Sequence, residues 1–278
     1  LLDGLNLRAY RHEPNVGKRK SWAAGDAVSR GIELASISEF EDEIYSEIQK
    51  DENWGFEKVF LNGENLSFGK DLNDWVIENV LFKVLYPAEF HGQSAIEASV
   101  KLSDLYKERE QEIEGIIIET HEPAIRIISN KDKLKNASDR DHSLEFMVAA
   151  GLLFKEVNSK TYEDNFSGLK QIENLRRKIK VQENKEFTEN YYDMSKRHIA
   201  NTVYFEYNDG SFSKKETVET PIGHPNRREE AEPLLKQKFI NNMSSHFSEE
   251  RAKDIWEKIL LIDVDSEFKE VIKLLSND

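Results

Sequence analysis

The sequence has 278 residues, with 53 acidic against 39 basic side chains and a formal net charge of −14 at neutral pH. This surplus of acid excludes broad electrostatic binding to nucleic acid or to an anionic membrane surface, because basic faces hold both. Cysteine is absent, which excludes disulfides, a thiol nucleophile and cysteine-ligated zinc or iron–sulfur sites within this chain. Apolar runs such as "VAAGLLF" are shorter than the roughly 20 residues of a membrane span, so we expect a soluble protein.

The N-terminal part combines a basic cluster with a predicted helix. The opening "LLDGLNLRAY" has no initiator methionine and no signal-peptide pattern, so we expect the chain to begin inside a domain. In residues 21–36 alanines and glycines recur at helical spacing, which predicts a helix packed closely against its neighbours. Lys18, Arg19 and Lys20 precede it. Lys20 lies at the predicted helix start, where unpaired N–H groups and the helix dipole favour an anion, so these residues form a carboxylate pocket or merely decorate the surface.

The next two segments are predicted to be helical. Residues 38–53 give an amphipathic pattern with a solvated acidic face. The stretch "YPAEFHGQSA" then places Glu89 and His91 at the start of another helix. A histidine near a carboxylate can act as a tuned acid or base, and the alternative is a hydrogen-bonded loop histidine.

The middle of the chain is predicted to contain strands. "GIIIETHEPAIRIIS" over 115–129 indicates two short buried strands around a break at His121. Ser138, with Asp141 three places on, resembles a capping box ahead of an apolar helix that ends near Phe154.

Several ionisable side chains surround these two features. His121 and Arg126 bracket the predicted strand break, while Asp139, Arg140 and His142 crowd the predicted helix start. Such a crowd is either a capped, exposed helix end or part of a site shared with the segment around His121.

The remaining chain predicts a hairpin followed by helices. "ANTVYFEY" and "SFSKKETVET" flank Asp209–Gly210, a pair that favours a tight turn. His224, Arg227 and Arg228 then form a basic group typical of a surface loop. Apolar stripes of period 3.6 predict helices over 231–247, 248–262 and 265–275.

The element order predicts an α+β fold, with a helical large domain interrupted by an α+β lid. The predicted boundaries are 1–80 and 223–278 for the large domain and 81–222 for the lid. Zinc-protease, calcium-loop and glycine-rich phosphate-binding motifs are absent, so we predict no metal and no cofactor.

A series of collinear motifs then points to one family. "YRHEPNVGKRKSWAAGDAVSR", "WGF", "ENVLFKVLYPAEFHGQSAIEA", "THEPAIRII", "ASDRDH", "YEDN", "KRHIAN" and "PIGHPNRR" occur in the order found in the MmgE/PrpD family, which the sequence resembles almost from end to end. The resemblance implies a homodimer that removes water from 2-methylcitrate, a small tricarboxylate, to give 2-methyl-cis-aconitate without an iron–sulfur cluster. Family members also carry an N-terminal helical region ahead of the position of Leu1, so we expect an exposed apolar face and consider a separate N-terminal fragment as a partner.

The resemblance also suggests residue roles. Lys20 resembles the active-site lysine of the family, and Glu89 and His91 fall where relatives place a pocket histidine. Our hypothesis gives carboxylate binding and charge stabilisation to Lys20 and proton transfer to His91, with His121 or His142 as a second candidate. The predicted substrate-binding residues are ionisable side chains of these segments, namely Arg19, Glu89, His121, Arg126, Asp139, Arg140 and His142.

Two other functions stay open on the sequence. One is a sibling activity on the same scaffold, such as decarboxylation of cis-aconitate. The other is a catalytically inactive chain that only associates with a partner.

Overall fold

The computed structural model describes residues 19–40, 49–67, 80–263 and 268–276. The chain divides into two compact units, Leu1–Val80 and Leu81–Asp278. Its mixture of helices with one four-stranded sheet confirms the predicted α+β class. The three-part domain division stays a prediction, and most of the helix predicted at 38–53 lies outside the described residues.

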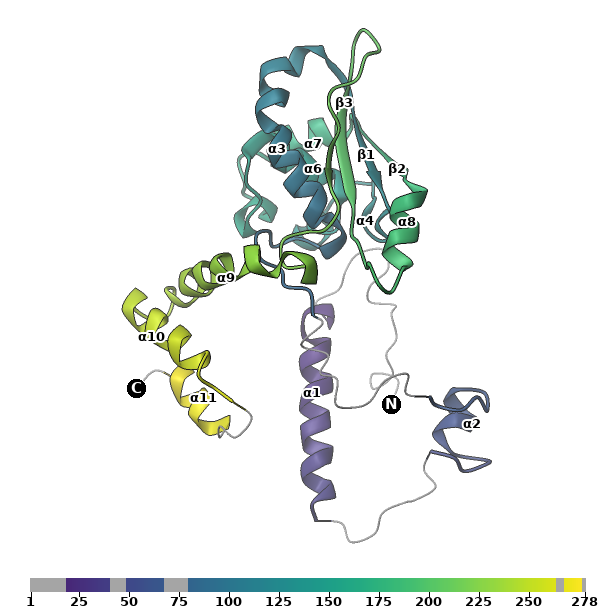
Figure 1. Cartoon of the computed structure of the whole chain (residues 1–278), viewed down its shortest axis with the longest axis vertical. Helices are drawn as coiled ribbons and strands as arrows, with labels where there is room; N and C mark the ends of the chain where they lie inside the picture. Colours follow the sequence, from purple (N-terminus) through teal and green to yellow (C-terminus); the bar gives the residue numbers. More distant parts are fainter. Residues whose placement is uncertain (1–18, 41–48, 68–79, 264–267, 277–278) are drawn as a thin grey trace. The chain divides into compact units, whose positions relative to one another are not determined.

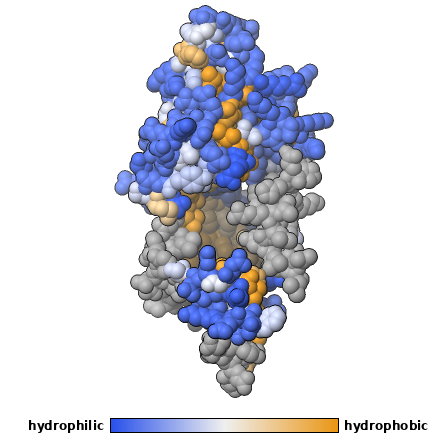
Figure 2. All heavy atoms as spheres, turned by 90° about the vertical axis from the view of Figure 1, so that its right-hand side faces the viewer, coloured by the Kyte–Doolittle hydropathy of each residue, from blue (hydrophilic) through white to orange (hydrophobic). Residues whose placement is uncertain are grey.

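The first unit contains helices α1 (Arg19–Ser38) and α2 (Phe56–Phe60), so the helix predicted at 21–36 is confirmed. The side chains of Val28, Ile32 and Leu34 are 62%, 63% and 65% exposed. These three side chains are not packed in the described part of the chain, and the close packing predicted for α1 stays a prediction. Figure 2 shows apolar side chains at the surface of the described residues, and the exposed apolar face expected from the family resemblance stays a prediction.

The second unit is organised around a mixed sheet of strand order β2-β1-β3-β4. Strand β1 (Ile113–Thr120) pairs in parallel with β2 (Ile179–Glu183) and antiparallel with β3 (Asn201–Tyr207). The short strand β4 (Glu216–Val218) pairs antiparallel with β3. The predicted hairpin is thus confirmed, and Gly210 in its turn has the positive φ of 80° that favours glycine.

Helices cover one face of this sheet (Figure 1). Helix α3 (Gln93–Arg109) packs against α6 (Leu144–Phe154), and α7 (Leu169–Arg176) packs against α6 in turn. Alternate strand residues point into this layer, so Ile116, Ile118 and Phe205 are fully buried. The core therefore fixes the ends of β1 and β3 against the start of α3.

Two local predictions are wrong. Residues 122–128 form helix α4 (Glu122–Ile128) rather than a second strand, with Pro123 in its first turn, where a missing N–H costs nothing. Ser143, not Ser138, accepts the capping hydrogen bond of α6, while Asn136 caps the short helix α5 (Ala137–Arg140). The apolar helix itself ends at Phe154 as predicted.

The end of the chain is helical as predicted, with α9 (Arg228–Met243), α10 (Glu249–Ile259) and α11 (Phe268–Leu275). None of the helices in the described ranges is both long and apolar enough to cross a membrane.

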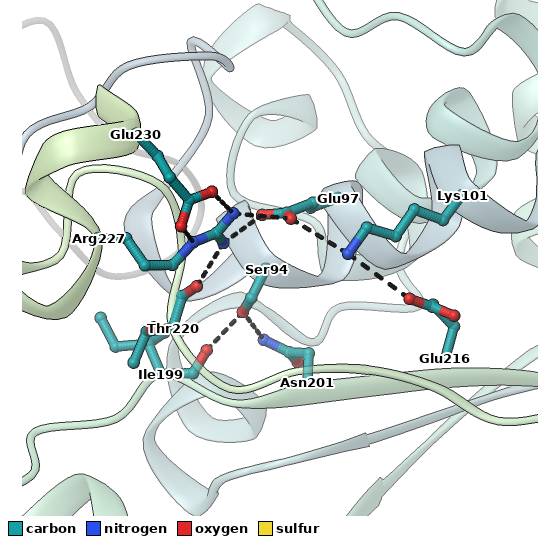
Figure 3. Close-up of polar contacts among 9 residues, drawn as sticks. All are labelled: Ser94, Glu97, Lys101, Ile199, Asn201, Glu216, Thr220, Arg227 and Glu230. Carbon is teal, nitrogen blue, oxygen red and sulfur yellow. Dashed lines mark hydrogen bonds and ion pairs between the residues drawn. The ribbon is translucent and has the colours of Figure 1, made fainter. Parts of the chain in front are cut away.

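The chain enters and leaves the sheet region side by side, because Phe82 N–H donates to the Gly223 carbonyl at 3.0 Å. Arg227 then ties this junction to α3 (Figure 3). Its guanidinium donates to both Glu97 oxygens at 2.9 and 3.2 Å, to Glu230 and to the Thr220 carbonyl. Lys101 lies 3.2 Å from Glu97 on the other side. The start of α9 is therefore held to the helix that follows His91.

Candidate active site

One end of the sheet gathers the histidines singled out by the sequence. Because β1 and β3 are antiparallel, the last residue of β1, Thr120, lies opposite the first residue of β3, Asn201. His121 follows as the N-cap of α4, and His91 lies in the short helix η4 (Phe90–Gly92) that leads into α3. Four elements thus place their ends at one point.

The site is centred on a buried pair of imidazoles. His91 Nδ1 and His121 Nε2 are 2.8 Å apart, and both residues are buried. The Ala200 carbonyl, a weak partner at 3.4 Å from His121 Nδ1, can only accept, and on this contact we assign the proton of His121 to Nδ1. His121 Nε2 then accepts from His91 Nδ1–H, which leaves a lone pair on His91 Nε2.

Burial keeps this pair uncharged. It lowers the pKa of His91, with the Glu89 carboxylate opposing and Arg126 adding to the effect. Burial, and secondly the neighbouring His91, lower the pKa of His121 to about 4. Both imidazoles are therefore neutral near pH 7, the state in which His91 Nε2 can accept a proton.

Glu89 fixes the turn that carries His91. Its carboxylate accepts from the His91 backbone N–H at 2.7 Å, which makes it the N-cap of η4. The Glu89 N–H donates to the Asp141 carbonyl at 3.1 Å, so the loop containing His142 adjoins this turn. The Glu89 carboxylate thus holds the backbone at His91 in place and also opposes the lowering of the His91 pKa.

Asn201 supports the same turn from the sheet. Its Nδ2 donates to the His91 carbonyl at 2.9 Å and to Ser94 Oγ at 2.8 Å, and Ser94 Oγ donates to the Ile199 carbonyl (Figure 3). Within the described part of the chain, the buried Asn201 Oδ1 meets no hydrogen-bond donor. The amide is therefore committed to holding the backbone at His91 in place.

An aromatic ring covers the pair. Tyr191, in the last turn of α8 (Lys185–Tyr192), stacks on His121 with 4.7 Å between ring centroids and 13° between planes. Its centroid lies 5.5 Å from that of His91. Burial raises the pKa of the Tyr191 hydroxyl, so the phenol is neutral at physiological pH.

The structure brings Glu89, His91 and His121 together, as the sequence suggested. Arg126 is exposed and pairs with Glu122 at 2.9 Å, although its charge still acts on His91. Among the described residues, no group of three or more candidate ligand side chains is arranged to hold a metal ion.

The other predicted side chains serve the neighbouring loop. Asp139 Oδ2 accepts from the Lys135 N–H, and His142 Nδ1 lies 2.5 Å from Asp141 Oδ1. Arg140 is buried and donates to the Tyr162 carbonyl and to Asp164. These contacts give Arg140 a structural role, and substrate binding by this group stays a prediction.

Two further groups of predicted residues lie elsewhere in the chain. Lys20 and Arg19 open α1, as predicted, but their side chains lie outside the described residues. The surface loop predicted around His224 is wrong for that residue, which is buried, with its Nε2 3.1 Å from the Arg197 carbonyl. It caps a short helical turn over Pro225–Arg227, which explains its burial.

Sequence reasoning missed Tyr191, Asn201 and Ser94 as parts of this site. Asn201 ends the motif "KRHIAN" and Ser94 lies within "PAEFHGQSA", so the motifs contained both residues without indicating their partners. The segment containing Tyr191 carried no signal, because its contact with His121 joins residues 70 positions apart along the chain.

Comparison with known proteins places this geometry in a family. The model of the MmgE/PrpD C-terminal domain matches residues 86–263, which include both histidines, Asn201 and Tyr191. The chain is 42% identical over 259 residues to the 2-methylcitrate dehydratase of Escherichia coli K12, covering 92% of this chain and 54% of the relative.

Other relatives are named similarly. The 2-methylcitrate dehydratase of Salmonella typhimurium is 43% identical over 88% of this chain and 52% of the relative. The probable 2-methylcitrate dehydratase of Saccharomyces cerevisiae is 41% identical over 91% and 50%, respectively. The chain thus spans about half the length of these relatives. With a domain match across the whole sheet and its two-histidine end, the chain belongs to the MmgE/PrpD family.

Proposed function

We propose that this chain supplies the proton-transfer part of an active site that eliminates water from 2-methylcitrate. The single observation that carries the proposal is the buried contact between His91 Nδ1 and His121 Nε2 at 2.8 Å, for which the tautomer assigned above leaves a lone pair on His91 Nε2. The names and identities of the relatives supply the substrate. Their greater length makes the activity a property of a longer protein or assembly.

The chemistry needs a base, an acid and charge stabilisation. In the proposed step His91 Nε2 takes a proton from the carbon beside a substrate carboxylate. The electrons of that C–H bond form the C=C bond as the C–O bond on the adjacent carbon breaks, and the leaving hydroxyl takes a proton from a second side chain, acting as the acid, to depart as water. The proton on His91 Nδ1 stays shared with His121, which thereby stabilises the imidazolium as it forms. His142, paired with Asp141, remains the second candidate for proton transfer.

Carboxylate binding is proposed for Lys20, assisted by Arg19 and Arg126. The support is that Lys20 lies in the first turn of α1, where the helix dipole adds to its positive charge. Loss of one well-placed electrostatic group typically lowers turnover about 100- to 1000-fold. We therefore expect Lys20→Ala to lower activity by that factor in an active preparation without changing the circular dichroism spectrum.

The test of His91 follows the new C=C bond by absorbance at the ultraviolet edge after addition of 2-methylcitrate. The chain is assayed alone and co-expressed with the N-terminal half of the Escherichia coli relative. His91→Gln should lower the rate at least about 100-fold. His198→Gln is the matched control and should retain it, because His198 lies outside the pair.

If the His91→Gln preparation were as active as the wild type, the proposed role of His91 in proton transfer would be overturned. The absence of product from every preparation, including a co-expressed pair that forms a stable complex, would favour an inactive chain that only associates.

We also propose, from the family resemblance, a homodimer in the cytoplasm or, in a eukaryote, the mitochondrial matrix. Sedimentation velocity of the active preparation tests the dimer.

A further inference from the structure

The orientation of His121 is weakly defined by its hydrogen bonds. Its Nδ1 lies 3.4 Å from the Ala200 carbonyl and 3.4 Å from Thr120 Oγ1, both beyond the usual range for a nitrogen donor. Only the bond from His91 to Nε2, at 2.8 Å, is of normal length. One good hydrogen bond at one nitrogen does not by itself define the plane of the ring, so that plane depends on what packs against the fully buried imidazole.

The ring of Tyr191 supplies part of the packing that holds the plane of the His121 imidazole. Its ring lies nearly parallel to His121, with 13° between the planes and 4.7 Å between centroids, which is a stacked arrangement. Rotation of the imidazole would break this contact. The stack therefore helps to hold the plane of His121, and within that plane the hydrogen bond from His91 selects the direction of the Nε2 lone pair.

The helix that carries Tyr191 is attached to the two elements that flank His121. The Asn184 N–H, just before α8, donates to the Thr120 carbonyl at 2.8 Å. The Glu122 N–H, in the first turn of α4, donates to Thr188 Oγ1 at 2.9 Å. No residue of α8 is fully buried, so these bonds and the stack hold the helix, and they fix Tyr191 relative to His121 itself.

We propose that Tyr191 is a positioning residue, whose ring orients His121 and thereby keeps the proton of His91 on Nδ1 and the lone pair on Nε2. Its catalytic meaning rests on the proposed function, but the orientation is a property of this chain alone. The contribution is assigned to the ring and not to the hydroxyl, so phenylalanine should replace tyrosine.

Other groups also face the pair. Glu89 from the turn before α3 raises the pKa of His91, and Arg126 from α4 lowers it. On the α8 side the facing group is Tyr191, and the β3 side contributes the uncharged Ala200 carbonyl. None of these charged groups is altered when Tyr191 is replaced, so a change in titration reports the loss of the ring.

The experiment uses the 278-residue chain labelled with nitrogen-15 histidine. Imidazole nitrogen shifts report the tautomer and the pKa of His91 and His121, assigned with His91→Gln and His121→Gln. Tyr191→Phe should leave both unchanged. Tyr191→Ala should mix the tautomers of His121 and raise its pKa by about 0.5 to 1, because water then reaches the ring. Phe212→Ala is the control, since Phe212 is an aromatic residue that is 56% exposed and whose ring contacts Tyr204 and neither histidine.

Two results would overturn the proposal. One is a Tyr191→Ala chain with the wild-type tautomer and pKa, provided that the methyl shifts of the β1 isoleucines show an intact core. The other is a Tyr191→Phe chain altered as much as Tyr191→Ala, which would assign the effect to the hydroxyl. Neither result depends on turnover, so a failure of the proposed dehydration would be seen separately in the absorbance assay.

Discussion

The low pKa of His121 predicts that the second unit loses stability in mild acid. The group has a pKa of about 4 in the folded chain against an ordinary value of 6.5. As the pH falls below 6.5 the unfolded chain takes up a proton that the folded chain does not, so protonation favours unfolding. The loss begins near pH 6.5 and is complete near pH 4.

The magnitude follows from the size of this window. Each pH unit between the two pKa values is worth about 1.4 kcal/mol. Lowering the pH from 7.5 to 5.0 crosses about 1.5 units of the window, so His121 should reduce the free energy of unfolding by about 2 kcal/mol. His121→Gln keeps a polar side chain that does not titrate and should lose this contribution.

Hydrogen exchange of the Ile116 and Ile118 amides measures the relevant free energy, because both lie in the buried centre of β1. Exchange rates at pH 5.0, 6.0 and 7.5 are corrected for the intrinsic pH dependence of amide exchange. The wild-type chain should lose about 2 kcal/mol more than His121→Gln between pH 7.5 and 5.0. Equal losses in the two proteins would refute the reasoning, because they would show that His121 titrates normally in the folded state.

Three other predictions concern the ion pair of Arg227 and two glycines. Arg227→Gln should destabilise the second unit by about 1 to 3 kcal/mol in urea unfolding, because it leaves the largely buried Glu97 without its bidentate partner. The Arg251→Gln control, whose partner Asp254 is more exposed than Glu97, should stay within about 0.5 kcal/mol, and an equal loss would contradict the assignment. Gly223→Ala should destabilise by more than about 1 kcal/mol, because φ is 100° and the added Cβ would lie 2.0 Å from a facing carbonyl oxygen. Gly25→Ala should raise the helicity of α1 instead, since nothing lies within 4 Å of its Cβ position; a loss of far-ultraviolet signal would count against this.

The sequence predicted elements that local chemistry determines. The β3–β4 hairpin followed from Asp209–Gly210, and the C-terminal helices followed from their apolar period. The error at residues 122–128 came from β-branched residues, which favour strands. In α4 the same isoleucines serve a helix, with Ile128 buried and Ile127 exposed, because Pro123 at its start and packing against the sheet outweigh that preference.

The candidate site was predictable only in part. Glu89 and His91 are neighbours in the chain, so their proximity could be anticipated. His121 was recognised as a candidate, but its bond to His91 depends on the pairing of β1 with β3 and on the placement of α3. Tyr191 depends further on how α8 is attached to the ends of β1 and α4. No local pattern encodes such contacts.

The hydrogen bond between Phe82 and Gly223 makes the intervening stretch a candidate for transplantation. Because its two ends already meet, joining them or grafting them into a surface loop of another protein adds little loop-closure entropy. A graft that ends at Gly223 would omit Arg227 and leave Glu97 without its ion-pair partner. A graft that extends to Glu230 would include both ion pairs of Arg227, with Glu97 and with Glu230. The C-terminal boundary of such a graft should therefore lie at Glu230, seven residues beyond Gly223.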